Sequence, residues 1–106
     1  MIPISQPKFL GNEKNYVEKC LQTVWISSQG HFVRQFEEVL AEFLQVKHVI
    51  CTSNGTTALQ LALATLNLNA DDEVIVPNIT FGATANAVLA VGAKPILAEI
   101  CQKTWN

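Results

Sequence analysis

The sequence predicts an α/β fold in which helices flank a mostly parallel sheet. From residue 48 onward, short and continuously apolar segments alternate with helical segments in the order β-α-β-α-β. Strands without a polar face are typical of parallel sheets that are covered on both sides. Charged residues make up only 15% of the chain and hydrophobic residues 49%, so little of this structure is expected to face solvent. The expected strands are 48–52, 73–76 and 95–99, and the helices between them are 55–68 and 81–91.

The N-terminal segment is expected to be extended and then helical. Pro3 and Pro7 disfavour a helix in the first ten residues. A helix is predicted from about Glu13 to Thr23, because apolar residues recur there at helical spacing. Residues 25–30 break this pattern and are predicted to form a loop.

A second amphipathic helix is predicted over residues 31–45, and its apolar face is expected to pack on a core. That face consists of Phe32, Phe36, Val39, Leu40, Phe43 and Leu44. Segments 58–68 and 81–91 carry no charged face, which indicates helices buried on every side. The rest of this chain is too small to cover both. We therefore expect the cover to come from further chain or from another subunit.

Composition excludes several classes of function. A net charge of −2 without a basic cluster argues against nucleic acid and anionic membranes as partners. The three cysteines, Cys20, Cys51 and Cys101, show no C-x-x-C spacing, so neither a disulfide scaffold nor a metal site is expected. The N-terminus lacks the features of a signal peptide, and no apolar run reaches the roughly 18 residues of a membrane helix. A soluble, cytoplasmic protein is predicted.

The turn at residues 53–57 (Ser-Asn-Gly-Thr-Thr) is the strongest candidate site. It lies between an expected strand and an expected helix, where unpaired backbone N–H groups and the helix dipole favour an anion such as phosphate. Gly55 lets a ligand approach the backbone, and the hydroxyls of Thr56 and Thr57 add donors. The alternative is that Ser53 or Asn54 simply caps the helix.

Two further loops are candidates for ligand contacts. Ligands of parallel α/β proteins bind at the carboxyl ends of the strands, where the loop containing Phe81 is also expected to lie. Phe81 could stack on a planar ring, or it could be a hydrophobic staple or a core contact. Trp25 could anchor an interface, line a substrate pocket or be an ordinary buried tryptophan. Ser27 and Ser28 have no nearby His/Asp pattern that would make either a nucleophile.

Several motifs together resemble the DegT/DnrJ/EryC1/StrS family of sugar aminotransferases. They are Ser53-Asn-Gly-Thr-Thr-Ala-Leu59, Asp72-Glu-Val-Ile-Val-Pro77 and Thr80-Phe-Gly-Ala-Thr-Ala-Asn-Ala87. The segment Trp25-Ile-Ser-Ser-Gln-Gly30 is most similar to the GDP-perosamine synthase branch. The resemblance implies the aspartate-aminotransferase-like fold type I of enzymes that use pyridoxal 5′-phosphate (PLP). Residues 1–30 would then be an N-terminal arm, helix and loop, and residues 31–106 the incomplete start of the large PLP-binding domain.

The resemblance also implies roles for individual residues. Thr56 and Thr57, with the turn at Gly55, would hold the PLP phosphate, and Phe81 would stack on the pyridine ring. Residues of the loop at 25–29, namely Trp25, Ser27 and Ser28, would lie near the sugar nucleotide or a dimer partner. The family enzyme moves an amino group, usually from glutamate, to a nucleotide-linked 4-keto-6-deoxy sugar, and it works as a homodimer.

The lysine that forms the Schiff base in this family has no counterpart among the lysines of this chain. None of Lys8, Lys14, Lys19, Lys47, Lys94 and Lys103 stands in the serine-x-x-lysine context that marks it. We expect the chain alone to lack catalytic residues and transaminase activity. Two alternatives remain open at this point. One is a truncated, non-catalytic or subunit-pairing fragment, and the other is a free-standing module that binds phosphate or nucleotide.

Overall fold

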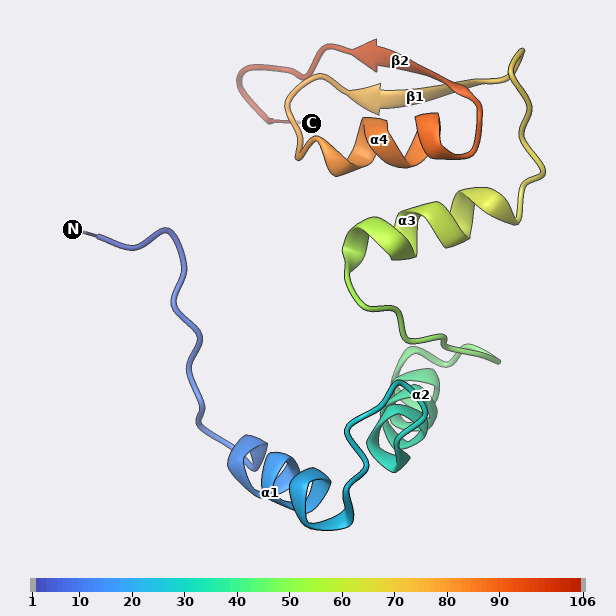
Figure 1. Cartoon of the computed structure of the whole chain (residues 1–106). Coiled ribbons are helices and arrows are strands. Elements are labelled where there is room, and N and C mark those ends of the chain that lie inside the picture. Colours follow the sequence, from blue (N-terminus) through green and yellow to red (C-terminus); the bar gives the residue numbers. More distant parts are fainter. Residues whose placement is uncertain (1, 106) are drawn as a thin grey trace. The chain divides into compact units, whose positions relative to one another are not determined.

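A computed structural model describes residues 2–105, which form two units (Figure 1). The first unit ends at Cys51 and the second begins at Thr52. The first contains α1 (Glu13–Thr23) and α2 (His31–Leu44), and the second contains α3 (Gly55–Ala64), β1 (Glu73–Pro77), α4 (Ala83–Ala90) and β2 (Lys94–Ala98). Within the described residues, none of the helices combines the length and the apolar character needed to cross a membrane.

The two helices of the first unit lie close to their predicted bounds. Glu13 lies in the first turn of α1, where its negative charge interacts favourably with the helix dipole. Its carboxylate accepts a hydrogen bond from the N–H of Gly11 at 2.9 Å. The ring of Tyr16 contacts that of Phe32 in α2, with centroids 5.0 Å apart. No side chain of α1 or α2 is fully buried, so the apolar stripe of α2 exists but is not covered within this unit.

Both helices of the first unit end in a left-handed residue that is not glycine. Val24 follows α1 with φ 60°, and Gln45 follows α2 with φ 54°. At the end of α2, the N–H of Gln45 donates to Glu42 and that of Val46 donates to Ala41, at 3.1 and 3.0 Å. These two bonds form a Schellman motif, which satisfies the last carbonyls of the helix.

The predicted strand at 48–52 is wrong. A strand needs a neighbour for its backbone hydrogen bonds, and only β1 and β2 pair in the described part of the chain. In this segment the N–H of Cys51 donates instead to the carboxylate of Glu37, at 2.8 Å. The segment therefore connects the two units without regular structure.

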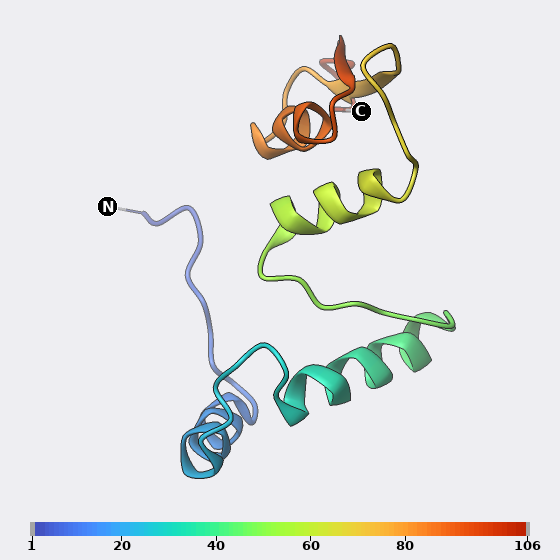
Figure 2. The ribbon, with the colours of Figure 1, turned by 45° about the vertical axis from the view of Figure 1, so that its right-hand side comes forward.

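The second unit is built on a parallel pair of strands joined by α4. β1 and β2 run side by side in register from Glu73 opposite Lys94 to Pro77 opposite Ala98, and α4 lies along them (Figures 1 and 2). The core consists of Val76, Val88 and Ala93, with Leu63, Leu68, Val74 and Val91 partly buried around it. This parallel pair with flanking helices confirms the predicted α/β class.

Gly92 ends α4 as the sequence indicates. Its φ of 87° suits glycine, and the N–H groups of Gly92 and Ala93 donate to the carbonyls of Leu89 and Val88 at 3.0 and 3.3 Å. This Schellman motif turns the chain so that Ala93 enters the core. The helix itself begins at Ala83, two residues later than expected.

The helix predicted over 55–68 is shorter than expected and ends at Ala64. The hydroxyl of Thr65 donates to the carbonyl of Ala62 at 2.7 Å, and i→i+3 backbone bonds replace the helical pattern there. Asn67 then adopts φ 52°, which stops any continuation. α3 packs on α4, but none of its side chains is fully buried, so the expectation that it is covered on all sides is not met within this unit.

Candidate functional site

The turn before α3 is organised by a capping box between Asn54 and Thr57. The Asn54 Oδ1 atom accepts the N–H of Thr57 at 3.0 Å, and the Thr57 hydroxyl accepts the N–H of Asn54 at 3.4 Å. That hydroxyl also donates to the Asn54 carbonyl at 2.9 Å. Of the two residues that could cap the helix, Asn54 is therefore the one that does so, and Ser53 is not.

The cap does not exhaust the donors at this helix end. The first-turn N–H groups of a helix have no partner inside the helix, and the cap uses only that of Thr57. Within residues 2–105, the N–H groups of Gly55 and Thr56 and the hydroxyl of Thr56 make no hydrogen bond. Capping and anion binding are thus compatible at this turn, because they use different donors.

Gly55 leaves room at this set of donors. A Cβ atom added to Gly55 would have nothing within 4 Å, and the φ of Gly55 does not require glycine. Packing within the unit therefore gives no reason for glycine here. The space beside Gly55 is open, and backbone N–H groups at the positive end of a helix dipole are donors of the kind that bind a phosphate.

Phe81 lies in the loop between β1 and α4, and its side chain is 82% exposed. The core-contact interpretation is therefore wrong for the described chain. The staple interpretation also fails, since α4 begins at Ala83 and its fourth residue is the polar Asn86. α3 and α4 both start on the side where β1 and β2 end, so the Gly55 turn and the Phe81 loop belong to the same edge of this unit (Figure 1).

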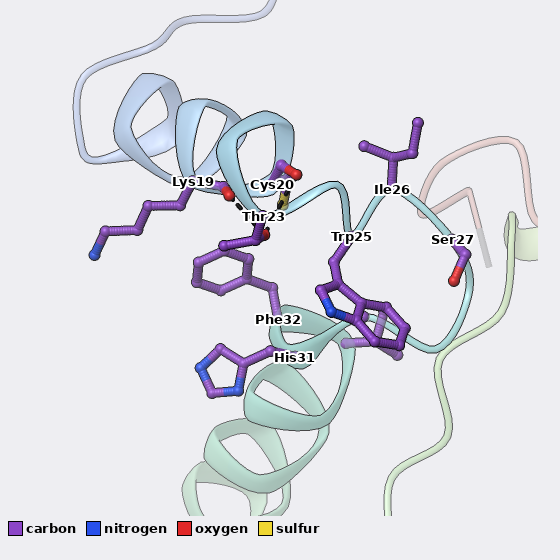
Figure 3. A pocket seen from close by; sticks show the side chains of 10 residues that line it. Lys19, Cys20, Thr23, Trp25, Ile26, Ser27, His31 and Phe32 are labelled. Atoms are coloured by element: carbon purple, nitrogen blue, oxygen red, sulfur yellow. Dashed lines mark hydrogen bonds between the residues drawn. The ribbon is translucent and has the colours of Figure 1, made fainter.

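Trp25 and Ser27 belong to the first unit, where they line a cavity of about 500 Å³ between the end of α1 and the start of α2. Figure 3 shows the Trp25 indole close to the start of α2, from which His31 and Phe32 project. Trp25 is 55% exposed, so the interpretation as an ordinary buried tryptophan is wrong here. Ser28 is exposed and does not line this cavity.

The cysteine thiols differ in their electrostatic surroundings. Partial desolvation and the nearby carboxylate of Glu37 raise the pKa of Cys51. Hydrogen bonds from the Thr104 side chain and from the backbone N–H groups of Lys103 and Thr104 lower the pKa of Cys101. All three cysteines are free, and the described residues contain no cluster of His, Cys, Asp and Glu side chains placed to hold a metal ion.

Sequence reasoning missed two interactions. The reciprocal bonding of Asn54 and Thr57 had a readable signal, which is a capping residue followed three positions later by a second hydrogen-bonding side chain. The bond from Cys51 to Glu37 had none, because it joins residues fourteen positions apart across a turn.

A parallel α/β unit whose helices start at the carboxyl ends of its strands is the architecture in which α/β proteins place their ligand-binding loops. Comparison with known families makes this specific. Residues 8–106 match the model of the DegT/DnrJ/EryC1/StrS aminotransferase family. The chain belongs to that family.

Individual relatives match between 74% and 99% of this chain. The chain is 46% identical to a GDP-perosamine synthase of Caulobacter vibrioides, over 99% of this chain and 28% of that protein. It is also 46% identical to a 3-oxo-glucose-6-phosphate:glutamate aminotransferase of Bacillus subtilis, over 74% of this chain and 18% of that protein. Among solved structures, NtdA of Bacillus subtilis with its bound cofactor PMP matches with a TM-score of 0.72 and 45% identity, over 79% of this chain and 19% of that one. The chain thus spans less than a third of the length of these relatives.

Proposed function

We propose that this chain forms the N-terminal part of the PLP-binding domain of a sugar aminotransferase that acts on a nucleotide-linked 4-keto-6-deoxy sugar, as a GDP-perosamine synthase does. The observation that carries the proposal is the 46% identity to a GDP-perosamine synthase over 99% of the chain. The 3-oxo-glucose-6-phosphate aminotransferase is equally identical, but only over 74% of the chain. Its name supports glutamate as the amino donor.

The turn at Gly55 and the loop at Phe81 are the proposed cofactor contacts. Gly55, Thr56 and Thr57 would form the phosphate site, and the exposed ring of Phe81 would stack on the pyridine ring of PLP. When bound, PLP supplies an electron sink that permits amino and proton transfer at the substrate carbon. This chain would hold the phosphate and orient the ring, and would thereby fix the position of the reacting atoms. Its proposed contact residues would not transfer a proton.

The cavity beside Trp25 and Ser27 is the proposed contact of the first unit with the sugar nucleotide or with a dimer partner. Its lining combines aromatic rings with hydroxyl groups, which suits a ligand with planar and polar parts. Ser28, which follows Ser27 in the same loop, is included in this proposal on the family resemblance alone. We also propose that the enzyme is a homodimer in the cytoplasm, where the three free thiols stay reduced.

We propose that the 106-residue chain has no transaminase activity by itself. None of its six lysines lies in the serine-x-x-lysine context of the family. Incubation with ¹⁵N-glutamate, PLP and a GDP-linked 4-keto-6-deoxy sugar should give no ¹⁵N-labelled sugar nucleotide. Label in the sugar would contradict this part of the proposal.

The cofactor assignment can be tested by titrating PLP into the chain and following the absorbance of the bound ring. We expect saturable binding, and we expect Gly55→Ala to weaken it about tenfold because the new methyl group occupies the phosphate space. Gly11→Ala is the control, since Gly11 lies in the first unit and an added Cβ would meet only the Glu13 carboxylate at 3.6 Å or more. Equal affinity of the wild-type and Gly55→Ala chains would refute the assignment.

A further inference from the structure

We propose that the cavity beyond the carboxyl ends of β1 and β2 binds a positively charged amino group carried on a small hydroxylated ring, as in an amino sugar. Glu99 would be the counter-ion of the amino group, and Trp105 would pack against the ring. That the ring is an amino sugar rests on the proposed function of the chain, whereas the recognition of an ammonium group rests on the residues of this cavity alone.

The cavity has a volume of about 430 Å³, within the range of roughly 300–1,000 Å³ that is usual for small-molecule sites. Its walls come from the segments that follow the two strands, which is where α/β proteins bind their ligands. The backbone N–H of Asn78 donates to the carbonyl of Ala98 at 2.9 Å, and this bond holds the two segments side by side. The lining residues are Asn78, Ile79, Glu99, Ile100, Gln102 and Trp105.

The lining of this cavity carries a negative charge. Glu99 is exposed, and no lysine, arginine or histidine is among the described residues that line the cavity with it. The carboxylates that accept hydrogen bonds within residues 2–105 belong to Glu13, Glu37 and Asp72, so that of Glu99 keeps its full acceptor capacity there. A carboxylate beside amide oxygens suits an ammonium group, which it binds by charge-assisted hydrogen bonds.

Trp105 supplies apolar surface next to this charge. Its backbone N–H donates to the Cys101 carbonyl at 2.8 Å, and the turn that this bond closes returns the chain to the cavity. The side chain is 70% exposed, so its ring has surface available to a ligand. An aromatic face packs against apolar C–H surface and also attracts a cation. The side-chain amides of Asn78 and Gln102 can both donate and accept, which suits hydroxyl groups.

A ring that carries an ammonium group and several hydroxyls is complementary to all of these features. The product of the proposed reaction has this chemistry, because amino transfer converts a keto sugar into an amino sugar. The proposed amino donor, glutamate, also carries an ammonium group, but its two carboxylates would face Glu99 with no cation in the lining to meet them. The charge of the cavity therefore favours the amino sugar over the amino donor.

The test is a titration of the 106-residue chain with the methyl glycoside of a 4-amino-4,6-dideoxyhexose, followed by the N–H shifts of Asn78, Glu99, Gln102 and the Trp105 indole. The comparison ligand is the matched glycoside with a 4-hydroxyl group. We expect the amino glycoside to bind about fivefold more tightly at low salt, and we expect high salt to reduce this preference. Neither PLP nor a nucleotide is present, so a failure of cofactor binding would leave this measurement unaffected.

Substitutions separate the two contacts. Glu99→Gln should remove the preference for the amino glycoside, whereas Glu38→Gln, which changes an exposed carboxylate of the first unit, should retain it. Trp105→Ala should weaken the binding of both glycosides about fivefold, and Trp105→Phe should restore most of the affinity because it keeps an aromatic face.

Each contact can also be refuted separately. Equal affinity of the unchanged chain for the two glycosides, or a preference that persists in Glu99→Gln, would overturn the role of Glu99. Unchanged affinity in Trp105→Ala would overturn the role of Trp105. Glutamate binding as tight as that of the amino glycoside would overturn the assignment to a hydroxylated ring. Absence of shifts at these residues with the amino glycoside would overturn the site as a whole.

Discussion

The two units of the chain differ in how their helices end and in whether they bury side chains. In the first unit, two helices end at left-handed residues with side chains, Val24 and Gln45, and no helical side chain is fully buried. In the second unit, α4 ends at a left-handed glycine and packs its buried Val88 against Val76 of β1. The second unit therefore contains a core of its own, whereas the first holds its helices mainly by local hydrogen bonds and half-exposed contacts.

This difference shows which unit can form a core from its own residues. A β-α-β unit closes a core from residues close in sequence, because the crossover helix returns the chain to the neighbouring strand. The apolar stripe of α2 has no such partner in its own unit. Substitutions should thus have large effects in the second unit and small ones at comparable apolar positions in the first.

The largest expected effect comes from a charge in the core of the second unit. Val88 is 2% exposed, so Val88→Asp would bury an unpaired carboxylate and should destabilise this unit by more than about 3 kcal/mol. Val39 of α2 is 58% exposed, and Val39→Asp should change stability by less than about 0.5 kcal/mol. Amide exchange during urea titration measures both changes, in β1 and β2 for Val88→Asp and in α2 for Val39→Asp. Similar losses in the two variants would contradict the contrast between the units.

A smaller effect is expected at the helix ends. Gly92→Ala places a Cβ at φ 87° and should destabilise the second unit by about 1–2 kcal/mol. Gln45→Gly relieves the same strain at φ 54° and should stabilise α2 by about 0.5 kcal/mol. Exchange rates of the last-turn amides of α4 and α2 measure the two changes. The two substitutions should change stability in opposite directions. If both were destabilising, Gln45 would not be strained.

These helix ends also show how far the sequence could predict the structure. α1, α2, β1, β2 and the glycine at the end of α4 follow from patterns within a few residues, and they were predictable to within one or two positions at most boundaries. The strand at 48–52 was not, because pairing depends on a neighbour that local pattern does not reveal. The early end of α3 was not predictable either, because it depends on the hydroxyl of Thr65, which bonds to a backbone carbonyl, and on Asn67, which adopts a left-handed φ. Both oppose the longer helix that the apolar pattern predicts.

The candidate site was predictable in part for the same reason. The small-residue turn at Gly55 and the cap at Asn54 are local features, so the sequence identified both but could not choose between them. Phe81 could have been a core residue by pattern, and only its 82% exposure removes that interpretation. The assignment of these residues to PLP came from the family resemblance, since a local pattern shows that an anion fits without showing which one.

The smallest expected effect is a difference in alkylation rate between one thiol of each unit. The raised pKa of Cys51 means that less thiolate is present at a given pH, and the lowered pKa of Cys101 means that more is present. Iodoacetamide should therefore modify Cys101 faster near neutral pH, and its rate should level off at a lower pH than that of Cys51. Glu37→Gln removes a charge that raises the Cys51 pKa and should speed its alkylation without affecting Cys101. Peptide mass analysis over time gives both rates, and faster modification of Cys51 in the unchanged chain would contradict the assignment.

The central claim is that the second unit holds the phosphate of PLP at the turn before α3, with Phe81 beside the ring. The most direct test is a ¹⁵N–¹H correlation spectrum of the chain during titration with PLP, with pyridoxal lacking the phosphate as the comparison ligand. The account predicts that PLP shifts the amides of Gly55, Thr56 and Phe81 most strongly, and that pyridoxal at the same concentration leaves Gly55 and Thr56 unshifted. Shifts centred elsewhere, or equal shifts with both ligands, would contradict it.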